Sequence, residues 1–141
     1  MRRGFSITIP AICWPLVVCL VASWVQAPLA ARPEQPVKPL KVWSAVTSWY
    51  GPRFHGRTTA SGQPFDMFAP TAAHLWLPFG SLIRVVSART GRSQLVRIND
   101  RGPFVDDREL DVSFLVASRL GIIDRGVDRV RIELLEVPRR R

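Results

Sequence analysis

From residue 42 onward the chain consists of short hydrophobic runs separated by turn-forming residues. The clearest run is 129–137, in which Val130, Ile132 and Leu134 alternate with charged residues. A period of two is typical of a strand with one buried face. Four further runs are rich in strand-forming residues and end at glycine, proline or polar clusters: 42–49, 81–86, 93–98 and 110–113. The pattern therefore predicts five or six short strands.

Two of the intervals between these runs have the composition of turns. Residues 88–92 contain Gly91 where a positive φ is expected, so they should join the second and third runs as a hairpin. Residues 99–103, Asn-Asp-Arg-Gly-Pro, should end the third run sharply. We therefore expect a loop directly after Ile98.

One helix is predicted, over Phe114–Leu120, where most positions are apolar. Ser113 is placed to cap its beginning, and Gly121 is placed to end it. Short strands with a single helix favour a mainly β fold, namely a small six-stranded β-barrel with a helical insertion. Closure into a barrel would also remove the exposed strand edges that such short strands would otherwise leave.

The first 31 residues have the features of a secretory signal peptide. The first three residues carry two arginines, 11–25 is almost wholly apolar, and small residues follow. The alternative is a transmembrane anchor, but a membrane span needs about 20 apolar residues, and Pro15 interrupts this run. We expect cleavage after Ala30 or Ala31, with no stable membrane span afterwards.

Both cysteines lie inside this segment, at Cys13 and Cys19. The mature protein is therefore expected to have no thiol and no disulfide. Cys19 is a conceivable lipid-attachment site, but Val18 stands where a lipoprotein signal has a small residue, which argues against such anchoring. The predicted location is the cell envelope, either periplasmic or secreted.

The remaining chain divides into three parts by composition. Residues 32–41 contain three prolines and little that could pack, so they are interpreted as an extended linker. The barrel domain is expected over 42–137, and 138–141 is a basic tail. A basic protein usually binds an acidic partner, and here 20 Lys and Arg face 11 Asp and Glu, a net charge of +9. Export favours a wall polymer, because nucleic-acid binding would need the chain to stay in the cytoplasm.

Polar residues gather in three places, 54–66, 71–74 and 98–104. These segments and their neighbours resemble the RlpA-like family, and their ordered spacing over 46–135 makes the resemblance specific. The matching segments are Ser48-Trp49-Tyr50-Gly51, Phe54-His55-Gly56-Arg57, Thr59-Ala60-Ser61-Gly62, Thr71-Ala72-Ala73-His74, Leu77-Pro78-Phe79-Gly80, Gly91-Arg92-Ser93, Arg97 to Phe104, and Leu110-Asp111-Val112-Ser113.

The resemblance implies a double-psi β-barrel that acts as an endolytic peptidoglycan lytic transglycosylase, a lyase without a cofactor. Such enzymes cleave glycan strands between N-acetylmuramic acid and N-acetylglucosamine, and the muramoyl 6-hydroxyl closes on C1 to leave a 1,6-anhydro end. The expected partner is the glycan strand, bound by a monomer. Members often carry a further C-terminal domain that binds septal glycan. None follows within this sequence, so septal targeting is not expected.

This reaction needs one carboxyl group that first donates and then accepts a proton. Asp100 is the first candidate, since it follows an apolar strand and precedes a Gly-Pro turn. The alternative is ordinary turn chemistry, in which Asp100 caps the turn and pairs with Arg97 or Arg101. The family resemblance favours the catalytic role.

Asp111 and His74 are the other catalytic candidates. Asp111 lies between Leu110 and Val112, so on a strand its side chain would face away from them, and related barrels place an important aspartate there. Its alternative role is to cap the helix that begins after Ser113. His74 occupies the position of a functional histidine in the family, where it would orient the acid or bind substrate. The alternative is a hydrogen-bonded structural histidine.

One departure from the family pattern concerns Gln63, which stands where the family commonly has a glutamate. Glutamine keeps the hydrogen-bonding shape but transfers no proton. A non-catalytic, expansin-like barrel that binds polysaccharide is therefore the second hypothesis. Asp66 is a nearby carboxylate that could substitute for the glutamate.

The predicted substrate-binding residues combine aromatic, amide and charged side chains. Tyr50 and Trp76 could stack on sugar faces, although most aromatic side chains in a small barrel belong to the core. Arg101 would suit a carboxylate of the substrate. Together with the two residues discussed above, the predicted set is Gln63, Asp66, Tyr50, Trp76 and Arg101. No metal site is predicted, because the mature chain has two distant histidines and no cysteine.

Overall fold

The computed structural model describes residues 37–105 and 107–139. The segment interpreted as a signal peptide lies outside the described residues. Six strands, one α-helix and one 3₁₀ helix follow in chain order. They are β1 (Lys41–Trp49), η1 (Pro52–Phe54), β2 (Thr71–His74), β3 (Leu82–Ser87), β4 (Ser93–Asp100), β5 (Leu110–Val112), α1 (Phe114–Leu120) and β6 (Val127–Glu136).

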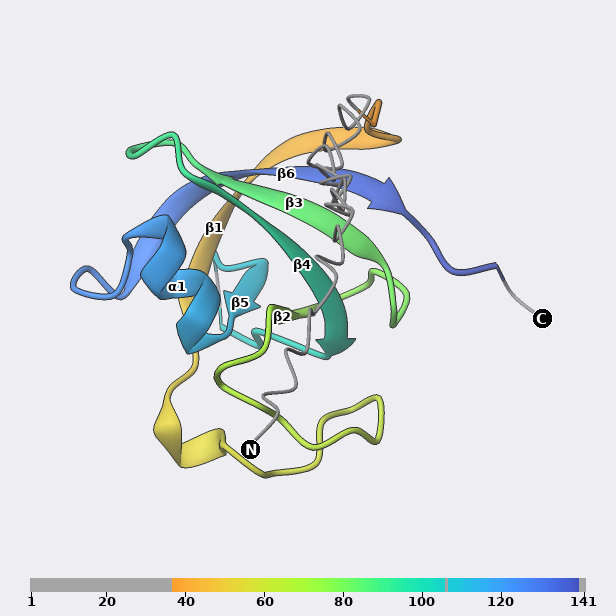
Figure 1. The fold of residues 1–141 in the computed structure, drawn as a ribbon, viewed down its shortest axis with the longest axis vertical. Coiled ribbons are helices and arrows are strands. Elements are labelled where there is room, and N and C mark those ends of the chain that lie inside the picture. The colour runs from red at the N-terminus through yellow and green to blue at the C-terminus, as the bar shows by residue number, and fades with distance from the viewer. Residues whose placement is uncertain (1–36, 106, 140–141) are drawn as a thin grey trace, which may run out of the picture. The chain divides into compact units, whose positions relative to one another are not determined.

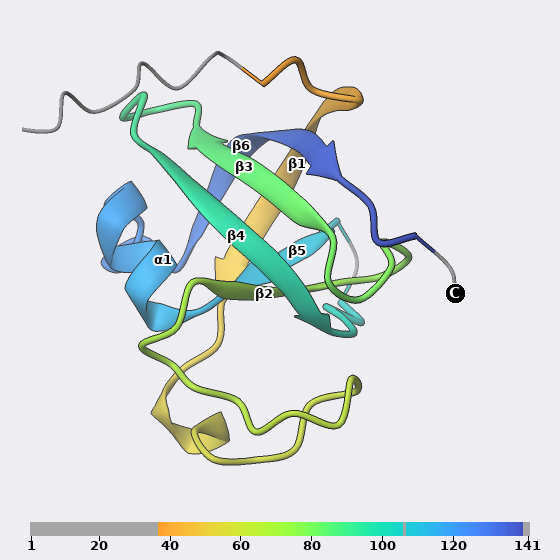
Figure 2. The same cartoon turned by 45° about the vertical axis from the view of Figure 1, so that its right-hand side comes forward.

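The six strands form a closed barrel in the order β1-β5-β2-β4-β3-β6 (Figures 1 and 2). Two neighbouring pairs are parallel, β1 with β5 and β2 with β4, and the other pairs are antiparallel. The mainly β barrel predicted from the sequence is thus confirmed. Every described strand has a partner on each side, so no backbone edge of the barrel is left unpaired.

The barrel interior is filled by the alternate apolar residues of the strands. In β3 the buried apolar positions are Ile83 and Val85, and in β6 they include Val130 and Ile132, each at most 1% exposed. These residues belong to one continuous core cluster that also includes Val116 of the helix. The period of two seen in the sequence therefore distinguishes the barrel interior from the surface.

β2 is the strand that the sequence pattern did not predict. It has four residues, Thr-Ala-Ala-His, and lacks the run of branched or aromatic side chains that marks a strand. Its conformation is held by pairing on both sides, with β4 through Thr71–Ala73 and with β5 through Ala72–His74. Tertiary pairing therefore creates this strand.

β4 also differs from the prediction, since it continues to Asp100 rather than ending at Ile98. The expected break at Asn99 was wrong, because Asp100 still pairs with Ala73 of β2. The polar residues after Ile98 thus belong to the strand, and the loop begins at Arg101. This extension keeps Asp100 paired in the barrel, although the register of β2 and β4 shifts between Ala72 and Ala73, so that Asn99 is passed over.

The helix α1 has the predicted bounds, Phe114–Leu120. The Oγ of Ser113 accepts a hydrogen bond from the Val116 N–H, and Gly121 ends the helix with φ 74°. The segment between β1 and β2, which contains η1, lies near β2 at one end of the barrel (Figures 1 and 2). Among the described residues, no helix combines the length and the apolar character needed to cross a bilayer.

Candidate active site

Two aspartates face the same pocket because of the register around β2. Ala73 pairs with Asp100 of β4 on one side and with Asp111 of β5 on the other. Ser48 of β1 then pairs with Asp111. Adjacent strands lie about 4.8 Å apart, so the two aspartate Cα atoms are about 10 Å apart. The small Ala73 side chain leaves space between the carboxyl groups.

The pocket in which these carboxyl groups lie has a volume of about 260 Å³. Its walls come mainly from the segment after β1 and from the loop after β4, and they include the aromatic side chains of Tyr50, Phe54, Phe65 and Phe104. The lining residues are Tyr50, Phe54, Arg57, Thr58, Thr59, Phe65, Ala73, Asp100, Arg101, Gly102, Pro103, Phe104, Val105 and Asp111. A hollow that combines aromatic side chains with a few convergent polar groups is typical of a ligand-binding site.

The Asp100 carboxyl group is held by backbone donors. Its Oδ1 accepts hydrogen bonds from the N–H groups of Ala60 and Arg101, both at 2.8 Å. Both bonds go to one oxygen, so Oδ2 is available to carry a proton. The turn-capping role considered for Asp100 is therefore present, through the Arg101 N–H, and it is compatible with a proton on the other oxygen.

The arginines expected to pair with Asp100 are directed elsewhere among the described residues. The Arg97 guanidinium donates to the Gly80 carbonyl at 2.7 Å. The Arg101 guanidinium donates to the Leu77 carbonyl at 2.9 Å and lies 3.7 Å from the centre of the Phe79 ring. Arg101 still lines the pocket, but its charged group is already engaged by the protein backbone.

Asp111 is held by a different set of donors. Its Oδ1 accepts a hydrogen bond from the Ser48 hydroxyl, whose oxygen in turn accepts one from Arg108 Nη1 at 2.7 Å. The positive guanidinium strengthens this chain of hydrogen bonds. The residue that caps the helix is Ser113, so the alternative role considered for Asp111 is filled by its neighbour.

The Tyr50 hydroxyl is buried beside both carboxyl groups. Burial raises the pKa of Tyr50 well above its ordinary value, and the charges of Asp100 and Asp111 raise it further. The phenol therefore stays protonated, and its ring packs 4.2 Å from that of Phe65, centre to centre. The Thr71 side chain lies beside the Tyr50 hydroxyl and partly offsets this rise in pKa.

His74 is not brought into this pocket. Its side chain is fully buried, and its Nδ1 accepts hydrogen bonds from the N–H groups of Trp76 and Leu77, both at 3.3 Å. The Nε2 lies 3.2 Å from Oε1 of Glu109, which also accepts a 2.9 Å hydrogen bond from the indole of Trp43. Since Nδ1 is an acceptor, the imidazole proton is on Nε2, facing Glu109.

The protonation of His74 follows from this setting. Burial lowers the pKa of His74, Glu109 partly offsets this, and the nearby Arg101 lowers it further. The imidazole is therefore neutral at pH 7. Neighbouring residues of a strand point to opposite faces, so Ala73 lies at the aspartate pocket while His74 turns toward Glu109.

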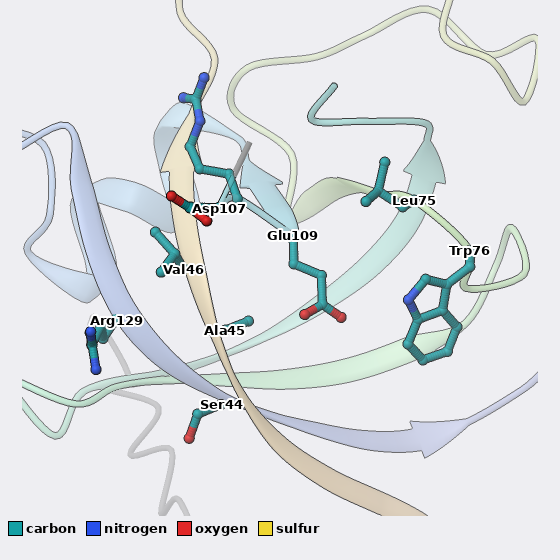
Figure 3. A pocket seen from close by; sticks show the side chains of 9 residues that line it. Ser44, Ala45, Val46, Leu75, Trp76, Asp107, Glu109 and Arg129 are labelled. Carbon is teal, nitrogen blue, oxygen red and sulfur yellow. The ribbon is translucent and has the colours of Figure 1, made fainter. Parts of the chain in front are cut away.

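Trp76 lies in a second, larger hollow of about 540 Å³ (Figure 3). Its indole is 51% exposed and stacks on Trp43 with ring centres 5.6 Å apart. Glu109 points into the same hollow (Figure 3). The structure thus separates Trp76 from Asp100 and Asp111, with which the sequence analysis had grouped it.

Gln63 and Asp66 are also separate from the two aspartates. Gln63 lines a third hollow, of about 290 Å³, formed by Ser61, Gln63, Phe79, Gly80, Arg97, Ile98 and Asn99. Asp66 is exposed and caps a turn, its Oδ1 accepting the Phe68 N–H at 2.8 Å. Neither side chain is among the residues that line the aspartate pocket.

Three residues of these hydrogen-bonded groups were not singled out from the sequence, namely Ser48, Arg108 and Glu109. Ser48 is the first residue of a matched motif, and Glu109 directly precedes the signature that contains Asp111. Their contacts could not be predicted because the partner residues are far apart in the sequence, for example 66 positions between Trp43 and Glu109. A prediction would have required the strand register.

The closed barrel with its two parallel strand pairs defines a double-psi β-barrel protein. One similar solved structure is the Streptomyces papain inhibitor, with a TM-score of 0.55 and 19% identity, over 71% of this chain and 99% of the inhibitor. Another is an expansin of Clavibacter michiganensis, with a TM-score of 0.55 and 16% identity, over 71% of this chain and 53% of the expansin. These likenesses concern the fold alone.

The family model described as lytic transglycolase matches residues 43–132, and the chain belongs to this family. Relatives named endolytic peptidoglycan transglycosylase RlpA include one from Pseudomonas aeruginosa, 49% identical over 62% of this chain and 26% of the relative. Another, from Neisseria meningitidis, is 51% identical over 61% of this chain and 36% of the relative. The chain thus spans about a quarter to a third of these relatives' length.

Proposed function

We propose that this domain is a peptidoglycan lytic transglycosylase that cleaves between N-acetylmuramic acid and N-acetylglucosamine and leaves 1,6-anhydromuramoyl ends. The observation that carries the proposal is the pair Asp100 and Asp111 on either side of Ala73 in one pocket. Membership in the lytic transglycolase family and the activity named for the relatives support it.

Asp100 is the acid and base of this mechanism. Oδ2 of the protonated carboxyl gives its proton to the glycosidic oxygen as the C1–O bond breaks. The muramoyl 6-hydroxyl then forms the new bond to C1, and its proton returns to Asp100. One bond is broken and one formed, no water is consumed, and a single carboxyl group serves both proton transfers.

Asp111 supports the reaction as a second carboxyl group. It is linked through Ser48 to Arg108, whereas Asp100 has no such link to a cation among the described residues. A fixed negative charge on the far side of Ala73 stabilises the positive charge that develops on the sugar ring. The two aspartates thereby take different roles because their neighbours differ.

The substitution Asp100→Asn tests the proposal. Asparagine keeps the acceptor oxygen for the Ala60 and Arg101 N–H groups but transfers no proton. We expect 1,6-anhydro ends, measured by mass spectrometry on peptide-free glycan strands, to fall by about 10²-fold or more. Unchanged circular dichroism would show that the fold is intact, and unchanged product formation would overturn the role of Asp100.

The second candidate function is a non-catalytic wall-binding barrel, which the glutamine at position 63 favours. The substitution Gln63→Glu separates the two functions. A wild-type domain that binds glycan without cutting it, with cutting restored in Gln63→Glu, would establish the binding module. We expect the wild type to cut, because Gln63 lies in a hollow apart from Asp100.

The remaining proposals concern the setting of the reaction. The domain would act outside the cytoplasm as a monomer, after cleavage of residues 1–31, either in the periplasm or secreted. Glycan strands would be its partner, contacted by Tyr50, Arg101, Trp76, Gln63 and Asp66. Cell fractionation together with the N-terminal sequence of the exported protein tests the location and the cleavage site.

A further inference from the structure

The hollow beside β4 contains a buried amide without a partner. Asn99 is buried, with 7% of the residue exposed, and it lines this hollow. Its Oδ1 accepts no hydrogen bond from any described residue. A buried carbonyl oxygen that has lost its water is unfavourable unless a donor replaces that water. The hollow therefore suits a ligand that brings an N–H group.

The other walls narrow the class of ligand. The Phe79 ring forms an apolar wall, and one of its faces is covered by the Arg101 guanidinium at 3.7 Å. The Arg97 guanidinium at the rim already donates to the Gly80 carbonyl. A carboxylate or phosphate oxygen would be repelled by Oδ1 of Asn99, because both are hydrogen-bond acceptors. An ammonium group would be repelled by the positive charge of Arg97. Neither anion nor cation matches this hollow.

An acetamido group has the complementary features. Its N–H can donate to the Asn99 amide oxygen, its carbonyl can accept from the amide donors of Asn99 or Gln63, and its methyl group suits the Phe79 wall. The Arg97 guanidinium at the rim keeps its positive charge while it donates to the Gly80 carbonyl, so it disfavours a cationic ligand. A neutral amide ligand with a small apolar end therefore fits best.

The hollow adjoins the aspartate pocket across one turn. Thr59 lines the pocket, whereas Ser61 and Gln63 line the hollow. The turn between them is closed by hydrogen bonds from the Thr59 N–H and hydroxyl to the Gln63 carbonyl, both at 2.8 Å. Asn99 and Asp100 are consecutive in β4. A polymer held at Asp100 can therefore extend over this turn to Asn99.

We propose that this hollow is a subsite that binds the acetamido group of an amino sugar near the cleaved bond, with Asn99 as the residue that recognises it. The inference rests on the proposed action on glycan strands and adds a specificity determinant to it. It predicts that the domain distinguishes N-acetylated from de-N-acetylated glycan through Asn99.

Binding is measured with peptide-free glycan strands in three forms: native, chemically de-N-acetylated, and re-N-acetylated as a control for the treatment. We expect Asn99→Ala to bind the native and re-N-acetylated forms at least about tenfold more weakly than wild type, with little change for the de-N-acetylated form. Arg119→Ala, an exposed change on α1, is the matched control. Equal losses for all three forms, or no loss, would overturn the inference.

A second measurement covers the case in which Asn99→Ala does not fold. In the wild-type protein, the side-chain amide resonances of Asn99 should shift when a soluble oligomer of N-acetylglucosamine is added, and should not shift with the de-N-acetylated oligomer. Absence of the shift at saturation would overturn the inference. Cleavage of native strands without acetamido discrimination would leave the proposed function standing, while discrimination without cleavage would leave only this subsite.

Discussion

Asp100 and His74 illustrate how single residues acquire their chemistry here. Both belong to matched motifs, but one carboxyl group opens on a pocket while the imidazole is enclosed by Trp43, Trp76 and Glu109. The donors around Asp100 leave one of its oxygens available, whereas both nitrogens of His74 face protein groups. The side chain of His74 thus supports the barrel near the site rather than lining the aspartate pocket.

The first prediction, at this scale, concerns the pH dependence of stability. Burial lowers the pKa of His74 in the folded state, while in the unfolded chain it is about 6.5. Below about pH 6.5 the unfolded chain gains a proton that folded His74 resists, so the free energy of unfolding should fall, by at most about 1.4 kcal/mol per pH unit. Above about pH 6.5, His74 is neutral in both states and no longer lowers the free energy of unfolding.

Urea unfolding between pH 7.5 and 5 measures this effect. The variant His74→Gln should lose the part of the pH dependence of stability that comes from His74. The control His55→Gln, which replaces a partly exposed imidazole, should keep it. The two variants are compared by the change of stability with pH rather than by absolute stability. Equal slopes in wild type and His74→Gln would contradict the assignment of the neutral buried imidazole.

At the scale of elements, α1 is specified by local chemistry and β2 by its neighbours. The ends of α1 follow from Ser113 and Gly121, which are adjacent to it in the chain. β2 has no comparable local signal and exists because β4 and β5 supply its hydrogen bonds. This contrast explains why the helix bounds could be predicted to the residue and the strand could not.

The second prediction tests the cap of α1. The buried Ser113 hydroxyl accepts the Val116 N–H and donates to the Ala69 carbonyl at 2.6 Å. Ser113→Ala removes both bonds, and we expect the free energy of unfolding to fall by about 1–3 kcal/mol. Ser118→Ala, at an exposed position of the same helix, should change it by less than about 0.5 kcal/mol. Denaturant titration followed by circular dichroism measures both, and similar losses would argue against the cap.

At the scale of the whole molecule, β6 closes the barrel by pairing with both β1 and β3. Its inward residues join the continuous core, so closure and core formation occur together. The rigid barrel then holds Asp100, Ala73, Asp111 and Ser48 in one row. Positioning by paired strands is more exact than positioning by loops.

The third prediction concerns this coupling. Ile132 of β6 is fully buried, and Ile132→Ala should lower the free energy of unfolding by about 2–5 kcal/mol. Leu95→Ala removes a similar side chain that is 43% exposed on β4, and should have a much smaller effect. Tryptophan fluorescence and far-ultraviolet circular dichroism should report the same transition. Two separate transitions would show that closure and core formation are independent.

The amino-acid sequence by itself determined the features that depend on near neighbours. The alternation in 129–137 predicted a strand, Ser113 and Gly121 marked the helix, and the polar motifs singled out Asp100 and Asp111. The break expected at Asn99 was wrong, because turn-forming composition was outweighed by pairing with β2. Local propensity is a weak prior that tertiary pairing can override.

Only the tertiary structure decided which side chains meet. Ser48 reaches Asp111 through the pairing of β1 with β5, and Trp43 reaches Glu109 across 66 positions of the chain. The same register turned His74 away from the aspartate pocket, while Trp76 follows β2 and lines a separate hollow. Asn99 is buried next to Asp100. A shift of one residue in a strand turns every side chain to the other face. The site is therefore a property of the strand register, which no local pattern in the sequence specifies.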